Sequence, residues 1–193
     1  MSEAKEALKE TVYKLSPLED FEWEDFSACW HPVKFCKGDF IIKYGQVEKY
    51  FYFVHHGVVR AFIQKDDQEV SVGFSYDTEF TGAYDSFLAQ QPTDFYIEAI
   101  TEASLLRITY HDLMNLFDKY KNVERWGRIF NASILIGMGR RQVEVRAFSA
   151  EEKFDRLMKQ SPHIFQLVPQ KYLASYLGMT PETLSRMRKK KSI

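Results

Sequence analysis

The alternation of apolar and polar residues divides the chain into three stretches. In residues 3–30 apolar side chains recur at helical spacing among charged ones, which predicts a helical N-terminus. Over residues 33–108 the apolar side chains instead come in short runs rich in Val, Ile, Phe and Tyr. Helical spacing returns at His111-Asp112-Leu113 and continues in a long helix over residues 123–146. The apolar residues of the first stretch include Leu8, Val12, Leu15, Phe21 and Phe26.

Turn sequences punctuate the middle stretch and predict its architecture. They are Lys37-Gly38-Asp39, Tyr44-Gly45-Gln46, His56-Gly57, Lys65-Asp66-Asp67-Gln68 and Tyr76-Asp77-Thr78. Short strands with turns at this spacing are typical of an antiparallel sandwich or barrel. We expect four glycines to adopt turn or bulge conformations that a side chain would oppose, namely Gly38, Gly45, Gly57 and Gly82.

The long helix is predicted from an apolar stripe with three- and four-residue spacing. Its members are Val123, Trp126, Phe130, Ile134 and Met138. Gly137 and Gly139 weaken the helix locally, but either glycine would permit the close approach of a second helix. Ser149, with acidic residues directly after it, is expected to cap another helix, and we place a domain boundary there.

Residues 170–191 have the pattern of two short helices joined by a tight turn. Gly178 stands where such a turn needs a left-handed residue. Thr180 is expected to cap the second helix, with Pro181 at its first position. The apolar side chains directed toward the core are expected to be Ala174, Leu177, Leu184 and Met187.

The other face of the second helix is polar and basic, which fits the major groove of DNA. Arg186 is the best candidate for a bidentate contact with guanine. Lys189, Lys190 and Lys191 are better suited to neutralise phosphates, each adding about one unit to the salt slope. The alternative is an ordinary helical hairpin whose basic end is solvated. The predicted DNA-binding residues are Thr180, Glu182, Thr183, Ser185, Arg186, Arg188, Lys189 and Lys190.

Charge is distributed unevenly along the 193 residues. The formal net charge of the whole chain is −1, but residues 151–193 carry a net charge of +5 and residues 1–150 a net charge of −6. Two cysteines are too few for a disulfide framework and fit a reducing compartment. The N-terminus lacks the apolar core of a signal peptide, and no run of eighteen apolar residues occurs. We therefore expect a cytoplasmic protein that does not enter a membrane.

Three segments, in order, make the chain resemble the Crp/Fnr family of transcription regulators. The glycine-punctuated strands around Lys37-Gly38-Asp39 and Gly45-Gln46 resemble the family's cyclic-nucleotide-binding-like β-roll, and residues 123–146 resemble its dimerisation helix. The run Thr180-Pro181-Glu182-Thr183-Leu184-Ser185-Arg186 resembles its recognition helix. The resemblance implies a homodimer whose base-reading residues include Glu182 and Arg186. A third, basic reader of that family falls on Pro181, so a different target sequence is expected.

The ligand residues that this resemblance implies are missing. Phe80-Thr81-Gly82 and the stretch from Pro92 to Ala99 take the place of the family's phosphate-binding cassette. Ala83 replaces the Glu that holds the ribose, and Thr93-Asp94 replace the Arg-Ser pair that meets the cyclic phosphate. The adenine-contacting hydroxyls fall near Met138 and Gly139, which lack them. Because Asp94 would repel a phosphate, cyclic AMP binding in the usual mode is not expected.

Two readings of the roll interior remain open. Tyr84, Ser86, Thr93 and Tyr96 form an aromatic, hydrogen-bonding set suited to an unidentified small-molecule effector that is uncharged or differently charged. Alternatively these side chains fill the roll and no ligand exists. The full set of predicted ligand-pocket residues is Gly82, Ala83, Tyr84, Ser86, Thr93, Asp94 and Tyr96.

Other chemistry is disfavoured. Two cysteines cannot ligate the iron–sulfur cluster of the family's oxygen sensors, and Cys29, His31 and Cys36 do not have a recognised metal spacing. Of the adjacent His55 and His56 only one can face the roll interior, so a metal-dependent barrel enzyme is not expected. The run Tyr50-Phe51-Tyr52-Phe53 is better explained by sheet packing than by a stacking platform for single strands.

Together these features predict an α+β fold and a non-enzymatic DNA-binding regulator without a metal or cofactor. The fold is an N-terminal double-stranded β-helix or jelly-roll sensor domain, a long dimerisation helix and a C-terminal (winged) helix-turn-helix. The expected domains are residues 1–120, 121–148 and 149–193. The expected partners are double-stranded DNA and a second copy of the chain. The alternative function is a small-molecule binding module with a vestigial DNA-binding head.

Overall fold

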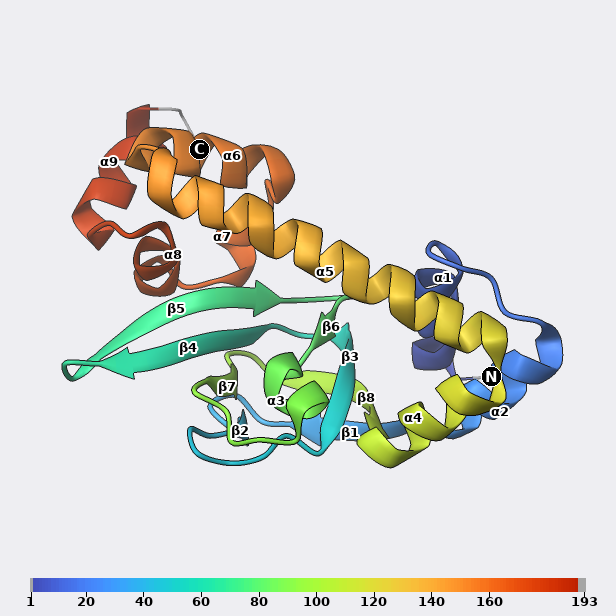
Figure 1. Cartoon of the computed structure of the whole chain (residues 1–193). Coiled ribbons are helices and arrows are strands. Elements are labelled where there is room, and N and C mark those ends of the chain that lie inside the picture. The colour runs from blue at the N-terminus through green and yellow to red at the C-terminus, as the bar shows by residue number, and fades with distance from the viewer. Residues whose placement is uncertain (1, 191–193) are drawn as a thin grey trace. The chain divides into compact units, whose positions relative to one another are not determined.

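The computed structural model describes residues 2–190 and divides the chain into two compact units (Figure 1). The first unit is Met1–Ala61 with Phe74–Leu135, and the second is Phe62–Gly73 with Ile136–Ile193. The division falls inside a β-hairpin and inside the long helix, so it differs from the expected domains 1–120, 121–148 and 149–193, which stay a prediction. Each unit is described by itself.

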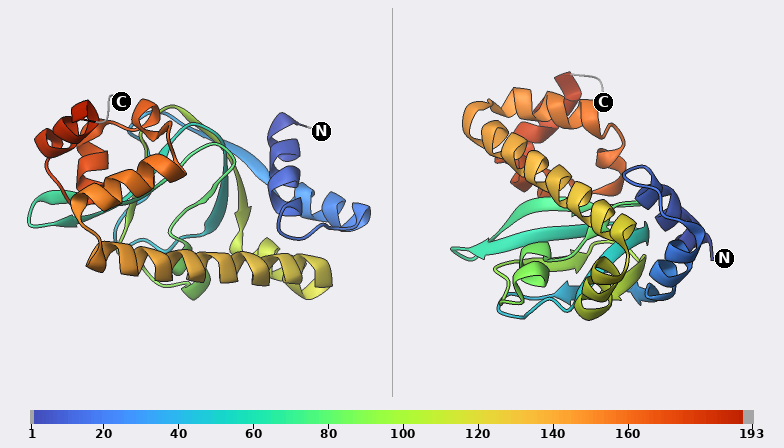
Figure 2. Two further views of the ribbon diagram at one scale, coloured as in Figure 1. Left: turned by 90° about the horizontal axis from the view of Figure 1, so that it is seen from above. Right: turned by 45° about the vertical axis from the view of Figure 1, so that its right-hand side comes forward.

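Two N-terminal helices replace the single helical stretch expected over residues 3–30. They are α1 (Glu3–Tyr13) and α2 (Asp20–Ala28). Pro17 explains the break, because it lacks an N–H donor and disfavours helical backbone in the residue before it. Glu19 then starts α2 with a capping box to Glu22. The views in Figure 2 place both helices at one end of the strands.

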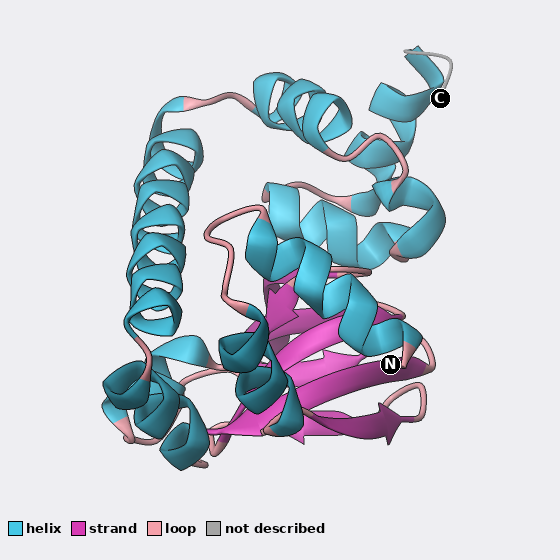
Figure 3. Ribbon diagram, turned by 90° about the vertical axis from the view of Figure 1, so that its right-hand side faces the viewer, coloured by secondary structure: helices cyan, strands magenta, loops and turns pink. Residues whose placement is uncertain are grey.

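In residues 2–190, eight strands form two four-stranded sheets, in the orders β1-β8-β3-β6 and β2-β7-β4-β5. Figure 3 shows the strands in magenta, lying alongside one another. The predicted β-roll is therefore confirmed. The strands are β1 (His31–Phe35), β2 (Phe40–Ile42), β3 (Tyr50–His56), β4 (Val59–Lys65), β5 (Gln68–Ser75), β6 (Phe80–Thr81), β7 (Tyr96–Ala99) and β8 (Ala103–Thr109).

The aromatic run of β3 divides between two hydrophobic cores. Phe51 and Phe53 belong to a core shared with the helices, and Tyr52 belongs to a core between the sheets. Successive side chains of a strand point to opposite faces, which explains the division. Tyr50 packs against the second core and lies under the guanidinium of Arg107, 4.3 Å from its ring centroid. The interpretation of this run as sheet packing is confirmed.

The glycines that punctuate the strands have the backbone conformation that the sequence predicts. Gly38, Gly45, Gly57 and Gly82 all have positive φ. At Gly57 (φ 104°) a Cβ atom would lie 2.4 Å from the carbonyl oxygen of Glu102, so no side chain fits there. Turn residues Asp66 and Asp67 also have positive φ and join β4 to β5.

Three helices complete the first unit. They are α3 (Tyr84–Ala89), α4 (Tyr110–Lys119) and the first part of α5 (Lys121–Ala147). The hydroxyl of Thr109 caps α4 by accepting a hydrogen bond from the N–H of Asp112 (3.0 Å). Of the predicted apolar stripe on α5, Val123, Trp126 and Phe130 are buried, whereas Met138 is exposed.

The C-terminal part of the second unit is helical. Its helices are the last part of α5, α6 (Ala150–Gln160), α7 (Ile164–Leu167), α8 (Gln170–Leu177) and α9 (Pro181–Lys190). The predicted cap of α6 is confirmed as a capping box, in which Ser149 Oγ accepts from the N–H of Glu152 and the Glu152 carboxylate accepts from the N–H of Ser149.

Within the same unit, α8 contacts the edge of the β4–β5 hairpin through Ser175. The Ser175 hydroxyl donates to the carbonyl of Glu69 (3.1 Å) and accepts from the N–H of Ser71 (3.0 Å). These two groups of β5 face the same side of the strand, where a neighbouring strand would otherwise pair with them. The Ser175 hydroxyl therefore provides hydrogen-bond partners for one carbonyl and one N–H on the edge of β5.

Candidate functional site

The α8–α9 pair is built by a tight turn between two short helices. Gly178 ends α8 in the left-handed conformation (φ 70°), as its place in the sequence predicts. Thr180 accepts a hydrogen bond from the N–H of Thr183 (3.2 Å), and Pro181 is the first residue of α9. The side chains of Ala174, Leu177 and Leu184 are buried and fix the two helices against each other.

The residues predicted to bind DNA lie on α9 and in the turn before it, with different degrees of exposure. Thr180, Glu182, Arg186, Lys189 and Lys190 are exposed, while Thr183, Ser185 and Arg188 are half-buried. The lysine predicted at position 191, Lys191, lies outside the described residues. The exposed set forms an outward polar face that carries Arg186 and the basic end of the helix.

Two basic residues of this set are held by other helices of the unit. The guanidinium of Arg188 lies 4.8 Å from the ring centroid of Phe165 in α7, a cation–π contact. Lys190 Nζ lies 3.5 Å from a carboxylate oxygen of Glu151 in α6. Arg186, by contrast, donates along its own helix, from Nη2 to the hydroxyl of Thr183 (3.3 Å).

Glu182 is ionised at neutral pH in this arrangement. The backbone N–H at the start of α9 and the Thr180 hydroxyl, followed by the charge of Arg186, lower the pKa of Glu182. A carboxylate acceptor and a guanidinium donor one turn apart can address different base edges.

The predicted ligand-pocket residues have different surroundings in the structure. Ala83 is buried between the sheets, whereas Tyr84 packs against the core shared with the helices. Tyr96 lies on the opposite face of β7 from Ile97 and stacks on Tyr44 at 6.4 Å between ring centroids. Asp94 is exposed, and Gly82 is in the turn before Ala83 with φ 119°.

Ser86 and Thr93, the remaining two, are buried and hydrogen-bonded within the chain. Ser86 Oγ accepts from the N–H of Glu48 (3.0 Å) and donates to the carbonyl of Gln91. Thr93 Oγ1 accepts from the N–H of Phe95 (3.0 Å). The polar atoms that the sequence assigns to a ligand therefore have protein partners in this structure.

Sequence reasoning missed a buried carboxyl group beside the cassette. Glu48 has 2% of its surface exposed, and its carboxyl oxygens accept from the N–H groups of Tyr50 (3.1 Å) and Ala83 (3.5 Å). Burial raises the pKa of Glu48 to about 7. It also raises the pKa of the neighbouring Tyr52 phenol. A lone Glu between Val47 and Lys49 carries no sequence signal for burial.

The cassette helix α3 also contacts α5 in a way that the sequence did not suggest. Tyr84 Oη donates to the side-chain oxygen of Asn131 (2.8 Å). Burial raises the pKa of Tyr84 to about 12, so the phenol stays protonated and can donate. Phe51, Phe80 and Phe130 surround this contact with ring centroids 5.0 to 5.5 Å apart.

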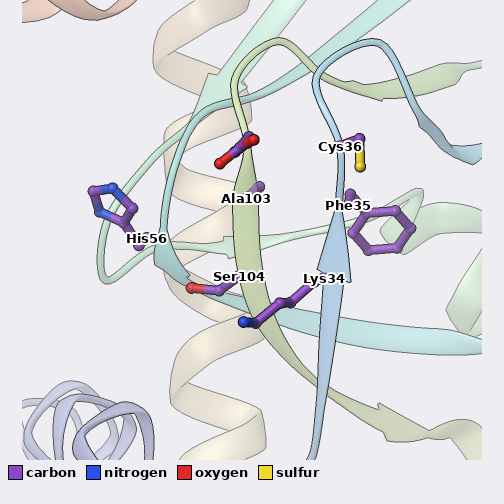
Figure 4. Close-up of a pocket in the computed structure, with 7 residues that line it drawn as sticks. Lys34, Phe35, Cys36, His56, Ala103 and Ser104 are labelled. Atoms are coloured by element: carbon purple, nitrogen blue, oxygen red, sulfur yellow. The ribbon is translucent and has the colours of Figure 1, made fainter.

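A depression of about 330 Å³ lies elsewhere on the first unit (Figure 4). Figure 4 shows Lys34 reaching toward Ser104, with the ring of Phe35 on the other side of β1. None of its residues belongs to the predicted ligand set. They are Lys34, Phe35, Cys36, His56, Glu102, Ala103 and Ser104.

No group of three or more His, Cys, Asp and Glu side chains in residues 2–190 could hold a metal ion. In the same part of the chain no helix is long and apolar enough to cross a membrane.

Comparison with known proteins supports a cyclic nucleotide-binding fold for the roll. Residues 32–120 match the cyclic nucleotide-binding domain family. A comparison with curated proteins finds no match.

Among solved structures, the chain is similar in fold to several regulators. The c-di-GMP responsive global regulator CLP of Xanthomonas campestris has 19% identity, with 90% of this chain and 92% of that one covered and a TM-score of 0.67. FixK2 of Bradyrhizobium japonicum has 17% identity, 83% coverage of both chains and a TM-score of 0.73. The catabolite activator protein of Thermus thermophilus has 20% identity, coverage of 94% and 86%, and a TM-score of 0.60. At these identities the likeness is one of fold.

Proposed function

The chain has a Crp/Fnr-like fold with a cyclic nucleotide-binding domain at residues 32–120, and from this premise we propose that it is a homodimeric, DNA-binding transcription regulator. Its α8–α9 pair is a helix-turn-helix, and α9 is the recognition helix that enters the major groove. The observation that carries this proposal is the exposed face of α9, on which Glu182, Arg186 and Lys189 stand outward while Leu184 anchors the helix.

The residues proposed to contact bases, Glu182 and Arg186, lie in the first two turns of α9. Arg186 has the planar, five-donor side chain that matches guanine O6 and N7, and Glu182 is an acceptor suited to cytosine N4. The hydroxyl of Thr183, one turn earlier, accepts a hydrogen bond from Arg186. This contact already restricts the Arg186 side chain, so less side-chain entropy is lost when the guanidinium binds DNA.

Lys189 and Lys190, at the end of α9, are the residues proposed to contact the phosphates of DNA. The net charge of +5 over residues 151–193 attracts DNA, while the net charge of −6 over residues 1–150 opposes it. Affinity for mixed-sequence DNA is therefore expected to be modest and strongly dependent on salt.

The dimer is proposed to form through the helix predicted at residues 123–146. A two-fold dimer presents two recognition helices to successive major grooves, about 34 Å apart, and reads a palindromic site. The roll is proposed to act as the sensor domain. Cyclic AMP is not its effector in the usual mode, because Ala83, Thr93 and Asp94 lack the groups that would hold the ribose and the cyclic phosphate.

A salt titration with mixed-sequence duplex DNA tests the DNA-binding function. We expect binding to weaken steeply with salt, and Lys189→Ala to reduce the slope of log K against log salt by about one. Lys159→Ala is the matched control, since Lys159 is an exposed lysine of α6, and it is expected to leave the slope unchanged. Absence of binding at low salt would instead favour a small-molecule binding module with a vestigial head.

A further inference from the structure

The carboxyl group of Glu48 is a buried group of the roll that has no role in the proposed function. Its side chain is almost fully buried, yet it lies outside every strand, between β2 and β3. Oε1 accepts from the N–H of Tyr50 (3.1 Å), and Oε2 accepts from the N–H of Ala83 (3.5 Å) at the start of the cassette helix. Buried carboxyl groups are rare unless their hydrogen bonds are satisfied, so this placement is specific.

The backbone around Glu48 is also joined to the cassette. The N–H of Gly45 donates to the carbonyl of Thr93, and the N–H of Thr93 donates to the carbonyl of Gln46, both at 2.9 Å. The N–H of Glu48 donates to Ser86 Oγ at 3.0 Å. The segment that bears the carboxyl group is therefore fixed against both ends of the cassette.

Small residues at the start of the cassette leave room for this side chain. A Cβ atom at Gly82 would lie 3.6 Å from Glu48 Oε2 and 3.3 Å from the ring of Tyr52, and Gly82 has a positive φ. Ala83, which follows, is itself 2% exposed. A longer side chain at either position would displace the Glu48 carboxyl group.

We propose that Glu48 is an internal ligand of the cassette, which takes the backbone donor of Ala83 and orders the loop without a bound cyclic nucleotide or phosphate. Ser86 and Thr93 complete this internal network, since their hydroxyls are engaged within the chain. An incoming phosphate would have to displace the carboxyl group from the N–H of Ala83 and, above the pKa of Glu48, would also meet its negative charge. The roll therefore rejects anionic nucleotides by occupying its own cassette.

Amide hydrogen exchange of the full chain tests this role directly. Glu48→Ala is expected to speed exchange at the amides of Ala83 and Tyr50 by about tenfold, the loss expected when a hydrogen bond to a charged group is removed. Glu48→Gln preserves the volume of the side chain and is measured if the alanine variant does not fold. Its amide keeps one acceptor oxygen and replaces the other with an NH2 donor, so exchange is expected to speed up at one of the two amides.

Glu79→Ala is the matched control, because Glu79 is another largely buried carboxyl group that accepts a backbone hydrogen bond, from Tyr76 (3.1 Å). This variant is expected to speed exchange at Tyr76 and to leave Ala83 and Tyr50 unchanged. Exchange at Ala83 and Tyr50 that stays at the wild-type rate in both Glu48 variants overturns the proposal.

The melting temperature in the presence of added ligands is the second test of the proposal. Cyclic AMP, cyclic GMP and inorganic phosphate at millimolar concentration are expected to leave the melting temperature of the wild-type chain unchanged. A raised melting temperature together with slower exchange at Ala83 would show that an external ligand takes the site from Glu48, and the proposal would fail. Because neither test uses DNA, the result is independent of whether α9 binds DNA.

Discussion

Arg186 and Arg188 stand two residues apart on α9 but have different surroundings. Arg186 is exposed and bonds to Thr183 on its own helix, whereas Arg188 is half-buried on the ring of Phe165. The sequence predicts DNA contact for both, because helical spacing alone does not reveal that α7 packs Phe165 against this side of α9. Arg186 therefore has the more exposed guanidinium of the two, which is why the proposed base readout is assigned to it.

Replacing Arg186 with alanine is expected to remove discrimination at one base-pair position. The expected loss is about 1–3 kcal/mol between the preferred base and its competitors, as for a bidentate guanine contact. Competition binding between single-base variants of a selected site measures it. Arg188→Lys, which retains the charge on Phe165, serves as the control and should keep the preference; equal preference in wild type and Arg186→Ala would contradict the assignment.

Glu48 is expected to make the stability of the roll depend on pH near neutrality. Burial raises its pKa to about 7, so the folded chain binds this proton more tightly than the unfolded chain does. The stabilisation is complete below about pH 4.5, the ordinary pKa of a free Glu, and is lost as the pH rises through about 7.

The measurement is the free energy of unfolding in urea for the wild type and for Glu48→Gln. Relative to the wild type, the variant should gain about 3 kcal/mol between pH 5 and pH 8. A difference between the two chains that stays constant over this range would show that the Glu48 carboxyl group does not titrate there.

Turns, helix caps and the alternation of side chains along strands could be predicted from the sequence, because each depends on residues that are close together in the chain. Positive φ at Gly57, Gly82 and Gly178, the cap at Ser149 and the alternation of Phe51 and Tyr52 all follow from short-range chemistry. The break between α1 and α2 was missed, although Pro17 marks it. Phe21, which shared the apolar spacing of the first stretch, is 60% exposed and packs edge-on against Tyr120.

The cassette could not be predicted in the same way, because its partners are distant in the sequence. Glu48 and Ala83 are 35 residues apart, and Tyr84 and Asn131 are 47 apart. No periodicity links such pairs. The absence of the usual ribose and phosphate residues was readable from the sequence, but the group that occupies their place was not.

Gly127 of α5 lies directly against the Phe117 ring of α4. A Cβ atom there would lie 2.5 Å from the Phe117 ring, so Gly127→Ala is expected to cost about 1–3 kcal/mol of unfolding free energy through overpacking. Urea unfolding measures this cost, and Phe117→Leu in the same chain should recover most of it. If Gly127→Ala lowers the unfolding free energy by the same amount with and without Phe117→Leu, the Phe117 ring is not the source of the overpacking.

At the scale of the whole molecule, α5 leaves a row of apolar side chains exposed. These are Leu135 (72%), Ile136 (55%), Met138 (61%), Val143 (58%) and Val145 (51%). Gly137 and Gly139 lie among them, with no other atom within 4 Å of where a Cβ would be. An apolar row with seven-residue spacing, such as Ile136 and Val143, suits a parallel helix from a second copy of the chain.

A charge in this row is expected to separate the proposed dimer. Ile136→Asp should shift the sedimentation behaviour from dimer to monomer at micromolar concentration, because an aspartate pair would be buried without a partner charge. Leu88→Asp, on an exposed apolar residue of α3, should remain dimeric. A dimeric Ile136→Asp chain would mean that another surface joins the two copies.

The most direct test of the account is selection of bound sites from a random duplex DNA library by the full chain, followed by sequencing of the enriched pool. The account predicts a two-fold symmetric motif with half-sites one helical turn apart, and its loss in the Arg186→Ala chain. Enrichment of no motif at low salt, in the presence and absence of nucleotides, would contradict it and leave α9 as a solvated basic helix.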